Sequence, residues 1–129
     1  MTKLVAIPLT EVGGVQFGMK RADVRKIFGD FTEFTKSRFS KNTSDDFGFC
    51  HVFYDTADEC EAIELFPEAE VTCRNQVVLP SSLATIQTIF PNLVEDEGGF
   101  IDKTISVGVT APSGNVESIL FGKPGYYSD

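Results

Sequence analysis

The sequence predicts an α+β fold, in which a mostly antiparallel sheet carries two short helices on one face and is built as a tandem repeat of two similar units. Two segments have the apolar spacing of short helices, the remainder consists of short aromatic-rich stretches joined by polar turns, and the two halves are similar at a constant shift. A chain of 129 residues is the size of one ordinary domain. We therefore expect residues 1–129 to form a single domain, with the first unit at about 15–66 and the second at about 77–121.

Each predicted helix carries one narrow apolar stripe at positions i, i+3 and i+4. The stripes consist of Val24, Ile27 and Phe28 in the first helix and of Ile86, Ile89 and Phe90 in the second. A short helix of this kind is stabilised when its stripe packs on another element. Gly29 is suited to end the first helix in a left-handed conformation, Pro91 cannot continue the second, and Ser81 is a favourable N-cap for the second.

The segments outside the helices have the composition of strands. Two pairs of strands are separated by short turns and are therefore expected to form antiparallel hairpins. These pairs are residues 47–54 with 60–66, and residues 104–110 with 116–121. Residues 31–39 and 71–73 are expected to add further strands. Because two short helices cover only one face of the sheet, the other face must contact water or a partner.

The strand at residues 47–54 shows what the open face could carry. Alternation places Phe47, Phe49, His51 and Phe53 on one face and Gly48, Cys50, Val52 and Tyr54 on the other. Neither set is polar, so we expect one set to pack under the helices and the other to form an aromatic patch of the kind found at binding surfaces. In the alternative interpretation, loops or the C-terminal Tyr126 and Tyr127 cover that patch.

The two units are similar at a shift of 62 residues. Residues 15–33 align with residues 77–95, and 5 of the 19 positions are identical. Further positions, such as Val24 with Ile86, have the same physical character. Chance similarity between two short amphipathic helices is the alternative, but the aligned positions agree in role as well as in identity. The pattern therefore indicates a duplicated helix-plus-sheet unit.

The first unit also resembles a known family. Gly18-Met19-Lys20, followed by Val24 and then by Phe28-Gly29, is similar to the G-M-T-x-x-x-V-x-x-x-x-G signature of BamE/SmpA-type small outer-membrane assembly proteins. Two tandem helix-plus-sheet units also resemble the architecture of β-lactamase inhibitor proteins, which bind enzymes through the concave aromatic face of a sheet. The resemblance implies this architecture and no particular functional residue. The chain departs from both families in having no lipid-attachment cysteine near its N-terminus and no cysteine pattern that suggests the inhibitors' disulfides.

Charge is divided unequally along the chain. Residues 1–41 contain 8 Lys/Arg and 4 Asp/Glu, whereas residues 42–129 contain 3 and 15, so a net charge of +4 is followed by one of −12. Residues 42–73 contain nine carboxylates and no Lys or Arg. A region of one sign attracts cationic partners and repels phosphate backbones, so we do not expect nucleic-acid binding. The N-terminal cations are expected to offset part of the acidic surface within the fold, or to pair across a dimer.

The sequence shows no catalytic or metal-binding pattern. The single histidine, His51, is adjacent to Cys50, and neighbouring strand residues point to opposite faces, so these two do not form a nucleophile–base pair. His51 with Cys60 or Cys73 is the remaining alternative. The carboxylates and cysteines follow no calcium or zinc spacing. We therefore expect no enzyme activity and no metal or other cofactor.

The cysteines and the N-terminus favour a cytoplasmic protein. Cys50, Cys60 and Cys73 are odd in number and follow no redox spacing, which is typical of buried thiols in a reducing compartment. The N-terminal apolar run is too short for a signal peptide. No stretch approaches the roughly 20 apolar residues that a membrane span requires, so we expect no membrane contact.

Small size, an acidic segment and the lack of a catalytic pattern together favour a binding protein. We expect an immunity or inhibitor-type protein that neutralises a basic protein, such as a bacterial nuclease toxin. The predicted docking residues are the carboxylates Asp45, Asp46, Asp55, Asp58, Glu59 and Glu61, with Phe47, Phe49 and Tyr54 as apolar anchors. A structural or assembly module, monomeric or homodimeric, and a small ligand-binding protein with a pocket between sheet and helices are the alternatives. Acidity that serves only solubility would explain the same charge.

Overall fold

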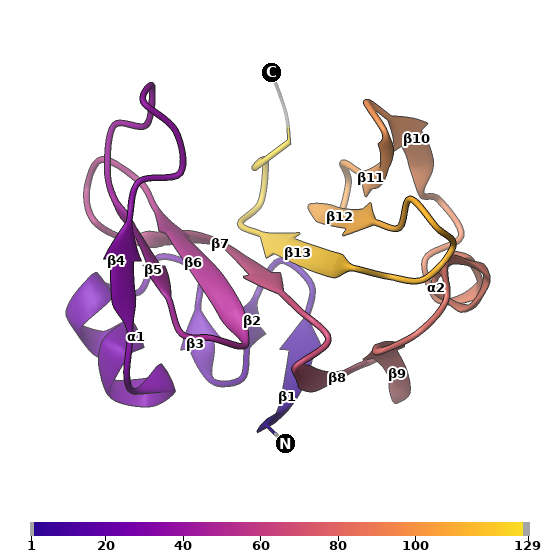
Figure 1. Ribbon diagram of the computed structural model, residues 1–129, viewed down its shortest axis with the longest axis horizontal. Coiled ribbons are helices and arrows are strands. Elements are labelled where there is room, and N and C mark those ends of the chain that lie inside the picture. The colour runs from indigo at the N-terminus through magenta and orange to yellow at the C-terminus, as the bar shows by residue number, and fades with distance from the viewer. Residues whose placement is uncertain (1, 128–129) are drawn as a thin grey trace.

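The computed structural model describes residues 2–127, which form two helices and thirteen strands (Figure 1). The helices are α1 (Arg21–Phe28) and α2 (Leu83–Ile89). The strands are β1 (Thr2–Ile7), β2 (Glu11–Val12), β3 (Val15–Gln16), β4 (Thr32–Phe34), β5 (Ser44–Asp46), β6 (Cys50–Tyr54), β7 (Cys60–Leu65), β8 (Ala69–Cys73), β9 (Gln76–Leu79), β10 (Val94–Asp96), β11 (Gly99–Asp102), β12 (Val107–Thr110) and β13 (Ser118–Gly122). The predicted α+β class with mostly antiparallel sheets is confirmed.

Eight strands form the larger sheet, in the order β10, β11, β12, β13, β7, β6, β5, β4, and every neighbouring pair is antiparallel. Along the chain, α1 is followed by β4 to β7, and α2 is followed by β10 to β13. The last strands of these two sets, β7 and β13, pair at the centre of the sheet, where Ile63 lies opposite Phe121. The sheet therefore has β4 at one edge and β10 at the other.

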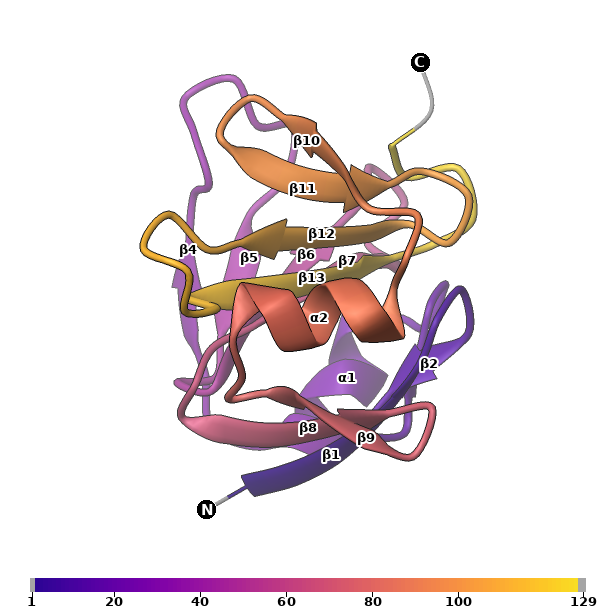
Figure 2. The ribbon, with the colours of Figure 1, turned by 90° about the vertical axis from the view of Figure 1, so that its right-hand side faces the viewer.

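A smaller sheet contains the strands β3, β2, β1, β8 and β9 in that order. Its central pair, β1 with β8, is parallel, with Leu4 opposite Val71. Parallel strands require a long crossover connection, and here α1 and the strands β4 to β7 lie between the two. Sequence analysis assigned no strand to residues 2–16, because this pairing joins segments that are distant along the chain. In Figure 2, α2 lies between this sheet and β13.

The hydrophobic core lies between the two sheets and the two helices. Val24 of α1 and Ile86 of α2 are fully buried, in one cluster with Val52, Ile63 and Phe121 of the larger sheet. One face of the larger sheet therefore packs against the helices, and we call it the inner face. The opposite face, which we call the outer face, carries the neighbours of these residues along each strand.

The helix ends agree with the sequence analysis at one of the two predicted caps. Gly29 follows α1 with φ 92°, in the left-handed region that glycine favours. The N-cap of α2 is Ser82 and not the predicted Ser81, because the Ser82 hydroxyl accepts a hydrogen bond from the Thr85 N–H at 3.2 Å. Ser81 instead donates its hydroxyl to the carbonyl of Val78 at 2.7 Å. Of two adjacent serines, the second is positioned for capping.

Three predicted strands are shorter than expected. Residues 31–39 contain only β4, residues 104–110 only β12, and residues 47–54 only β6. The last of these is interrupted by a turn, in which the Asp46 carboxylate accepts a hydrogen bond from the Gly48 N–H at 2.7 Å. Phe47 and Phe49 consequently leave the alternation of β6. Both rings pack on Phe28 of α1, each with its centroid 5.3 Å from that ring.

Candidate functional site

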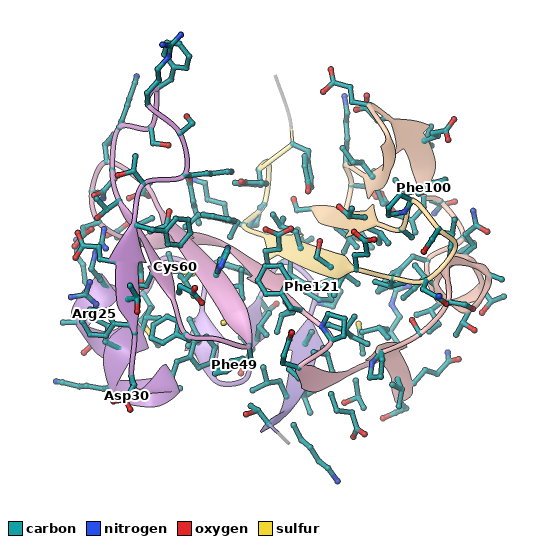
Figure 3. All side chains as sticks on the ribbon, viewed as in Figure 1. Arg25, Asp30, Phe49, Cys60, Phe100 and Phe121 are labelled. Carbon is teal, nitrogen blue, oxygen red and sulfur yellow. The ribbon has the colours of Figure 1, made fainter. Side chains whose placement is uncertain are left out.

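Asp45, the first of the predicted docking carboxylates, is fully buried between β5 and α1. Its two carboxylate oxygens accept hydrogen bonds from Nε and Nη2 of Arg25, both at 2.8 Å, and one also accepts from the Tyr54 hydroxyl at 2.9 Å. Nη1 of Arg21 lies 3.4 Å away. A two-pronged arginine–carboxylate pair is the strongest form of charged hydrogen bond. Figure 3 shows Arg25 where α1 meets β4 and β5. The docking role predicted for Asp45 is therefore incorrect, because its carboxylate is bound within the fold.

Arg21 joins the same cluster and is itself 8% exposed. Its guanidinium contacts the Asp58 carboxylate at 2.8 Å, donates to Oδ1 of Asn42 at 3.1 Å and lies over the Tyr54 ring at 4.1 Å. Hydrogen bonds from Arg21 and from Asn42 lower the pKa of Asp58 below its ordinary value. Asp58 is half-buried and bound to this cluster, so little of its charge is left for a partner.

Two further ion pairs connect the basic N-terminal region to the acidic one. Nζ of Lys20 lies 3.1 Å from the Glu59 carboxylate, and Nη2 of Arg25 lies 3.2 Å from that of Glu33. A hydrogen bond from the Thr43 hydroxyl, followed in size by that from Arg25, lowers the pKa of Glu33. These contacts confirm that cations of residues 1–41 offset part of the acidic surface within the fold.

The three predicted aromatic anchors are not available at the surface as proposed. Phe47 and Tyr54 are buried, with 8% and 5% of their area exposed. Phe49 is half-buried and packs against Phe28. Burial, followed by the hydrogen bond to Asp45, raises the pKa of the Tyr54 hydroxyl above its ordinary value. These side chains join α1 to the larger sheet and do not project toward a partner.

The remaining predicted carboxylates, Asp46, Asp55 and Glu61, are at least partly accessible. Asp46 caps the turn at Gly48, and its carboxylate lies 3.6 Å from Nε2 of His51. Asp55 accepts two backbone hydrogen bonds within its own turn, at 2.9 and 3.0 Å, and lies 3.9 Å from Nζ of Lys123. Glu61 borders a hollow beneath the segment between β4 and β5. These three carboxylates do not form one continuous docking surface with Asp45.

The aromatic residues of β6 lie where alternation predicts. Cys50, Val52 and Tyr54 belong to the core cluster, whereas His51 and Phe53 point to the outer face. The His51 ring lies 4.6 Å from Phe34 and 4.8 Å from Phe66, measured between ring centroids. Phe53 is only 5% exposed. The predicted aromatic patch therefore exists on the outer face but is largely covered.

The C-terminal Tyr126 and Tyr127 supply part of that cover, and two glycines make room for them. A Cβ atom added to Gly122 of β13 would lie 2.7 Å from Cβ of Tyr126, and one added to Gly108 of β12 would collide with the Tyr127 hydroxyl. Burial raises the pKa of Tyr126 to about 12 and that of Tyr127 also well above its ordinary value. Figure 1 shows this end of the chain between the two ends of the larger sheet. The alternative in which the tail covers the patch matches the structure.

Beside Tyr127 the outer face contains an acidic hollow of about 310 Å³. Its lining includes the carboxylates Glu64, Asp96 and Glu97, the polar Thr110 and Ser118, and the apolar Ile101 and Leu120. The Ser118 hydroxyl donates to Glu64 at 2.8 Å, which holds that carboxylate over β7 and β13. No lysine or arginine lines the hollow. It is therefore suited to a cationic group that brings an apolar portion with it.

Sequence reasoning missed this hollow. Glu64 was counted among the acidic residues of 42–73, but Asp96 and Glu97 were not considered as a site. The available signal was the run Glu95-Asp96-Glu97 directly before Gly98-Gly99, because three like charges at a turn are exposed to solvent. That this turn lies beside Glu64 follows only from the pairing of β7 with β13.

The thiols and the histidine lie apart. Cys50, Cys60 and Cys73 are free and buried, and burial raises the pKa of Cys60 to about 12 and that of Cys50 also above its ordinary value. His51 points to the opposite face of the sheet from Cys50. Burial with a raised pKa is typical of unreactive thiols. Among residues 2–127, no group of three or more His, Cys, Asp or Glu side chains is arranged to hold a metal ion.

Comparisons with known proteins give no relative for this chain. No family model, no curated protein and no solved structure matches it. Neither of the two described helices has the length and apolar character needed to cross a membrane. The function is therefore argued from the geometry of the outer face.

Proposed function

We propose that this protein is a non-catalytic, acidic binding protein that neutralises a basic protein by docking it on the outer face of the larger sheet. The observation that carries the proposal is the acidic hollow, where Glu64, Asp96 and Glu97 meet with no lysine or arginine among the lining residues. Elsewhere, Asp45, Asp58 and Glu59 are paired with cations of the same chain. The carboxylates of the hollow form no such pairs within residues 2–127, so their charge remains available.

The chemistry of the hollow favours a lysine or arginine side chain of the partner. Such a side chain brings a charged end to the carboxylates and an apolar stem to Ile101 and Leu120. Complementary charge accelerates encounter and selects among partners. The net charge of −8 extends this attraction beyond the contact surface.

Tyr126 and Tyr127 are suited to act as the apolar anchors of this surface. Their rings lie 5.1 Å apart and stand edge to face, and each is partly exposed. Tyrosines held in this way offer contact area with little loss of side-chain freedom on binding. They replace Phe47, Phe49 and Tyr54 in the docking surface that we propose.

The partner that fits this surface best is a basic enzyme acting on an anionic substrate, such as a bacterial nuclease toxin. An enzyme of that kind presents lysines and arginines to bind phosphate. A protein with a clustered acidic surface competes for those cations and blocks the substrate. We therefore assign the chain to the immunity or inhibitor type, acting in the cytoplasm.

The layout of the chain supports a duplicated origin for this surface. The shift of 62 residues relates the starts of α1 and α2 and the bounds of β4 and β10, and each helix is followed by four strands. We infer that two tandem units, of the architecture that β-lactamase inhibitor proteins and BamE/SmpA-type proteins suggest, join at β7 and β13. The parallel pairing of β1 with β8 does not follow from this arrangement.

The test is affinity capture with matched variants, followed by an activity assay on what is captured. The hollow variant carries Glu64→Gln, Asp96→Asn and Glu97→Gln. The control variant carries Asp30→Asn, Glu68→Gln and Glu117→Gln, which change the net charge equally at exposed positions outside the hollow. Figure 3 shows Asp30 beside the end of α1, far from the β10–β11 hairpin.

We expect the wild type and the control variant to retain one basic protein and to abolish its activity at a 1:1 ratio. The hollow variant should retain at most about a tenth as much, because three charged contacts are lost. Equal retention by the hollow variant would exclude the hollow as the docking site. Retention without loss of the captured protein's activity would exclude neutralisation.

A further inference from the structure

Two oppositely charged projections stand at the two ends of the larger sheet. The basic loop, residues 36–41, follows β4 at one edge and carries Lys36, Arg38 and Lys41. The acidic hairpin, β10 with β11, forms the other edge and carries Glu95, Asp96 and Glu97 at and beside its turn. Figures 1 and 2 show both projections rising on the same side of the molecule, beyond the outer face.

The charges of both projections lack partners of opposite sign. Within the part of the chain that the structure describes, Arg38 and Lys41 form no ion pair, and neither do Glu95 and Asp96. Lys36 lies at the base of the loop, with Nζ 4.2 Å from the Phe53 ring and 3.5 Å from the Tyr126 hydroxyl. The intramolecular neutralisation seen around Asp45 therefore does not extend to either projection.

Each projection also carries a highly exposed hydrophobic side chain. Phe39, in the basic loop, is 79% exposed, and Val94, in the acidic hairpin, is 67% exposed. These are the two most exposed large hydrophobic residues of the described chain. The Arg38 guanidinium lies over the Phe39 ring at 4.9 Å, so the apolar group and the cation are presented together. Val94 borders a hollow of about 470 Å³ with Ile101, Glu95, Asp96 and Lys103.

We propose that the protein self-associates as a symmetric dimer, in which the basic loop of each copy docks on the acidic hairpin of the other. A second copy turned by 180° in the plane of Figure 1 and placed above the first brings each loop over a hairpin of opposite charge. A two-fold axis makes both contacts at once, as a self-complementary interface requires. Phe39 of each copy then packs beside Val94 of its partner, and the tyrosine tails of the two copies face each other near the axis.

The dimer would cover the surface that we propose for the basic partner. The basic loop presents cations around an apolar ring, which is the chemistry expected of that partner. A partner would therefore have to displace the second copy before it reached the acidic hollow. The dimer itself does not depend on the existence of a partner.

The experiment measures mass by sedimentation velocity over a range of protein concentrations. The loop variant carries Arg38→Glu and Lys41→Glu, and the hairpin variant carries Glu95→Lys and Asp96→Lys. All four positions are exposed, so the fold is expected to tolerate the changes. A variant that combines all four substitutions keeps the wild-type net charge of −8 and serves as the matched control.

We expect the wild type to dimerise and each single-projection variant to weaken dimerisation at least about tenfold, because like charges then face each other. An equimolar mixture of the loop and hairpin variants should form mixed dimers, and the combined variant should dimerise again. Phe39→Ser should weaken the dimer without changing thermal stability. A wild type that is monomeric at every concentration would overturn the proposal, as would a mixture that fails to form mixed dimers.

Failure of this proposal is distinguishable from failure of the proposed function. The loop variant and Phe39→Ser leave all residues of the acidic hollow unchanged. They should therefore retain capture of the basic partner even where they are monomeric. Loss of capture in these two variants would show that the partner needs the dimer and would contradict the independence stated above.

Discussion

Both oxygens of the Asp45 carboxylate are bound by one guanidinium, that of Arg25, at 2.8 Å each. Asp45 has no exposed area, and the Tyr54 hydroxyl adds a third hydrogen bond. The same pair raises the pKa of Arg25 above its ordinary value, chiefly through the hydrogen bonds to Asp45. An acidic residue that composition alone presents as a docking group therefore holds α1 to the larger sheet.

Replacing Asp45 should destabilise the fold strongly. Asp45→Ala leaves the guanidinium groups of Arg21 and Arg25 without their shared anion, and removing one partner of a buried pair costs about 3–5 kcal/mol. The free energy of unfolding, measured by urea denaturation, should fall by that amount. The exposed control Asp30→Asn should stay within about 0.5 kcal/mol of the wild type. A loss below about 1 kcal/mol for Asp45→Ala would show that the cluster contributes little.

Stability should fall in acid because two native carboxylates have lowered pKa values. Glu33 and Asp58 lie below their ordinary values of 4.5 and 3.8, so in that window the unfolded chain binds more protons than the native one. The free energy of unfolding should be highest above about pH 5 and should decrease as the pH falls through the lowered values. Asp58→Asn should be less stable than the wild type at neutral pH and should converge with it in acid. A difference that stays constant with pH would contradict this linkage.

The fit of the tyrosine tail can be tested at Gly108. Gly108→Ala should cost about 1–3 kcal/mol, because the new methyl group collides with the Tyr127 hydroxyl. In a Tyr127→Ala background the same substitution should be neutral or slightly stabilising, since alanine is favoured over glycine inside a strand. Thermal unfolding of the four proteins completes the cycle. An equal cost in both backgrounds would place the clash elsewhere.

The three thiols should be unreactive in the native protein. Cys50, Cys60 and Cys73 are buried, and burial raises their pKa values, so little thiolate is present at neutral pH. A thiol-specific disulfide reagent should react slowly with native protein and should modify all three residues after unfolding in denaturant. Rapid modification of one thiol in the native state would indicate local opening around it.

Local sequence patterns predicted the elements that depend on local spacing. The apolar stripes located α1 and α2, and the turn residues located the β6–β7 and β12–β13 hairpins. Parallel pairing of β1 with β8 was not predicted, because it depends on contacts across more than sixty residues and leaves no periodic signal. Ser81 and Ser82 differ only in their position relative to the chain bend, which composition does not reveal.

The predicted site failed where burial decides the role of a charge. Asp45 and Asp46 are adjacent and chemically alike, yet alternation along β5 turns the first toward α1 and leaves the second at the surface. A sequence gives the sign of each charge but not its partner, so Asp58 and Glu59 were also assigned to docking. The hollow around Glu64 is assembled from β7 and the distant β10–β11 turn, and only the pairing of β13 with β7 brings them together.

The most direct test of the central claim is a two-dimensional ¹H–¹⁵N NMR titration with an oligo-arginine peptide as the cationic probe. If the acidic hollow is the docking surface, the amides of Glu64, Gly99 and Thr110 should shift in a saturable manner, and the hollow variant should lose these shifts. The control variant should keep them. Shifts confined to Asp55 and Asp58 in the turn after β6, with no change around Glu64, would contradict the account.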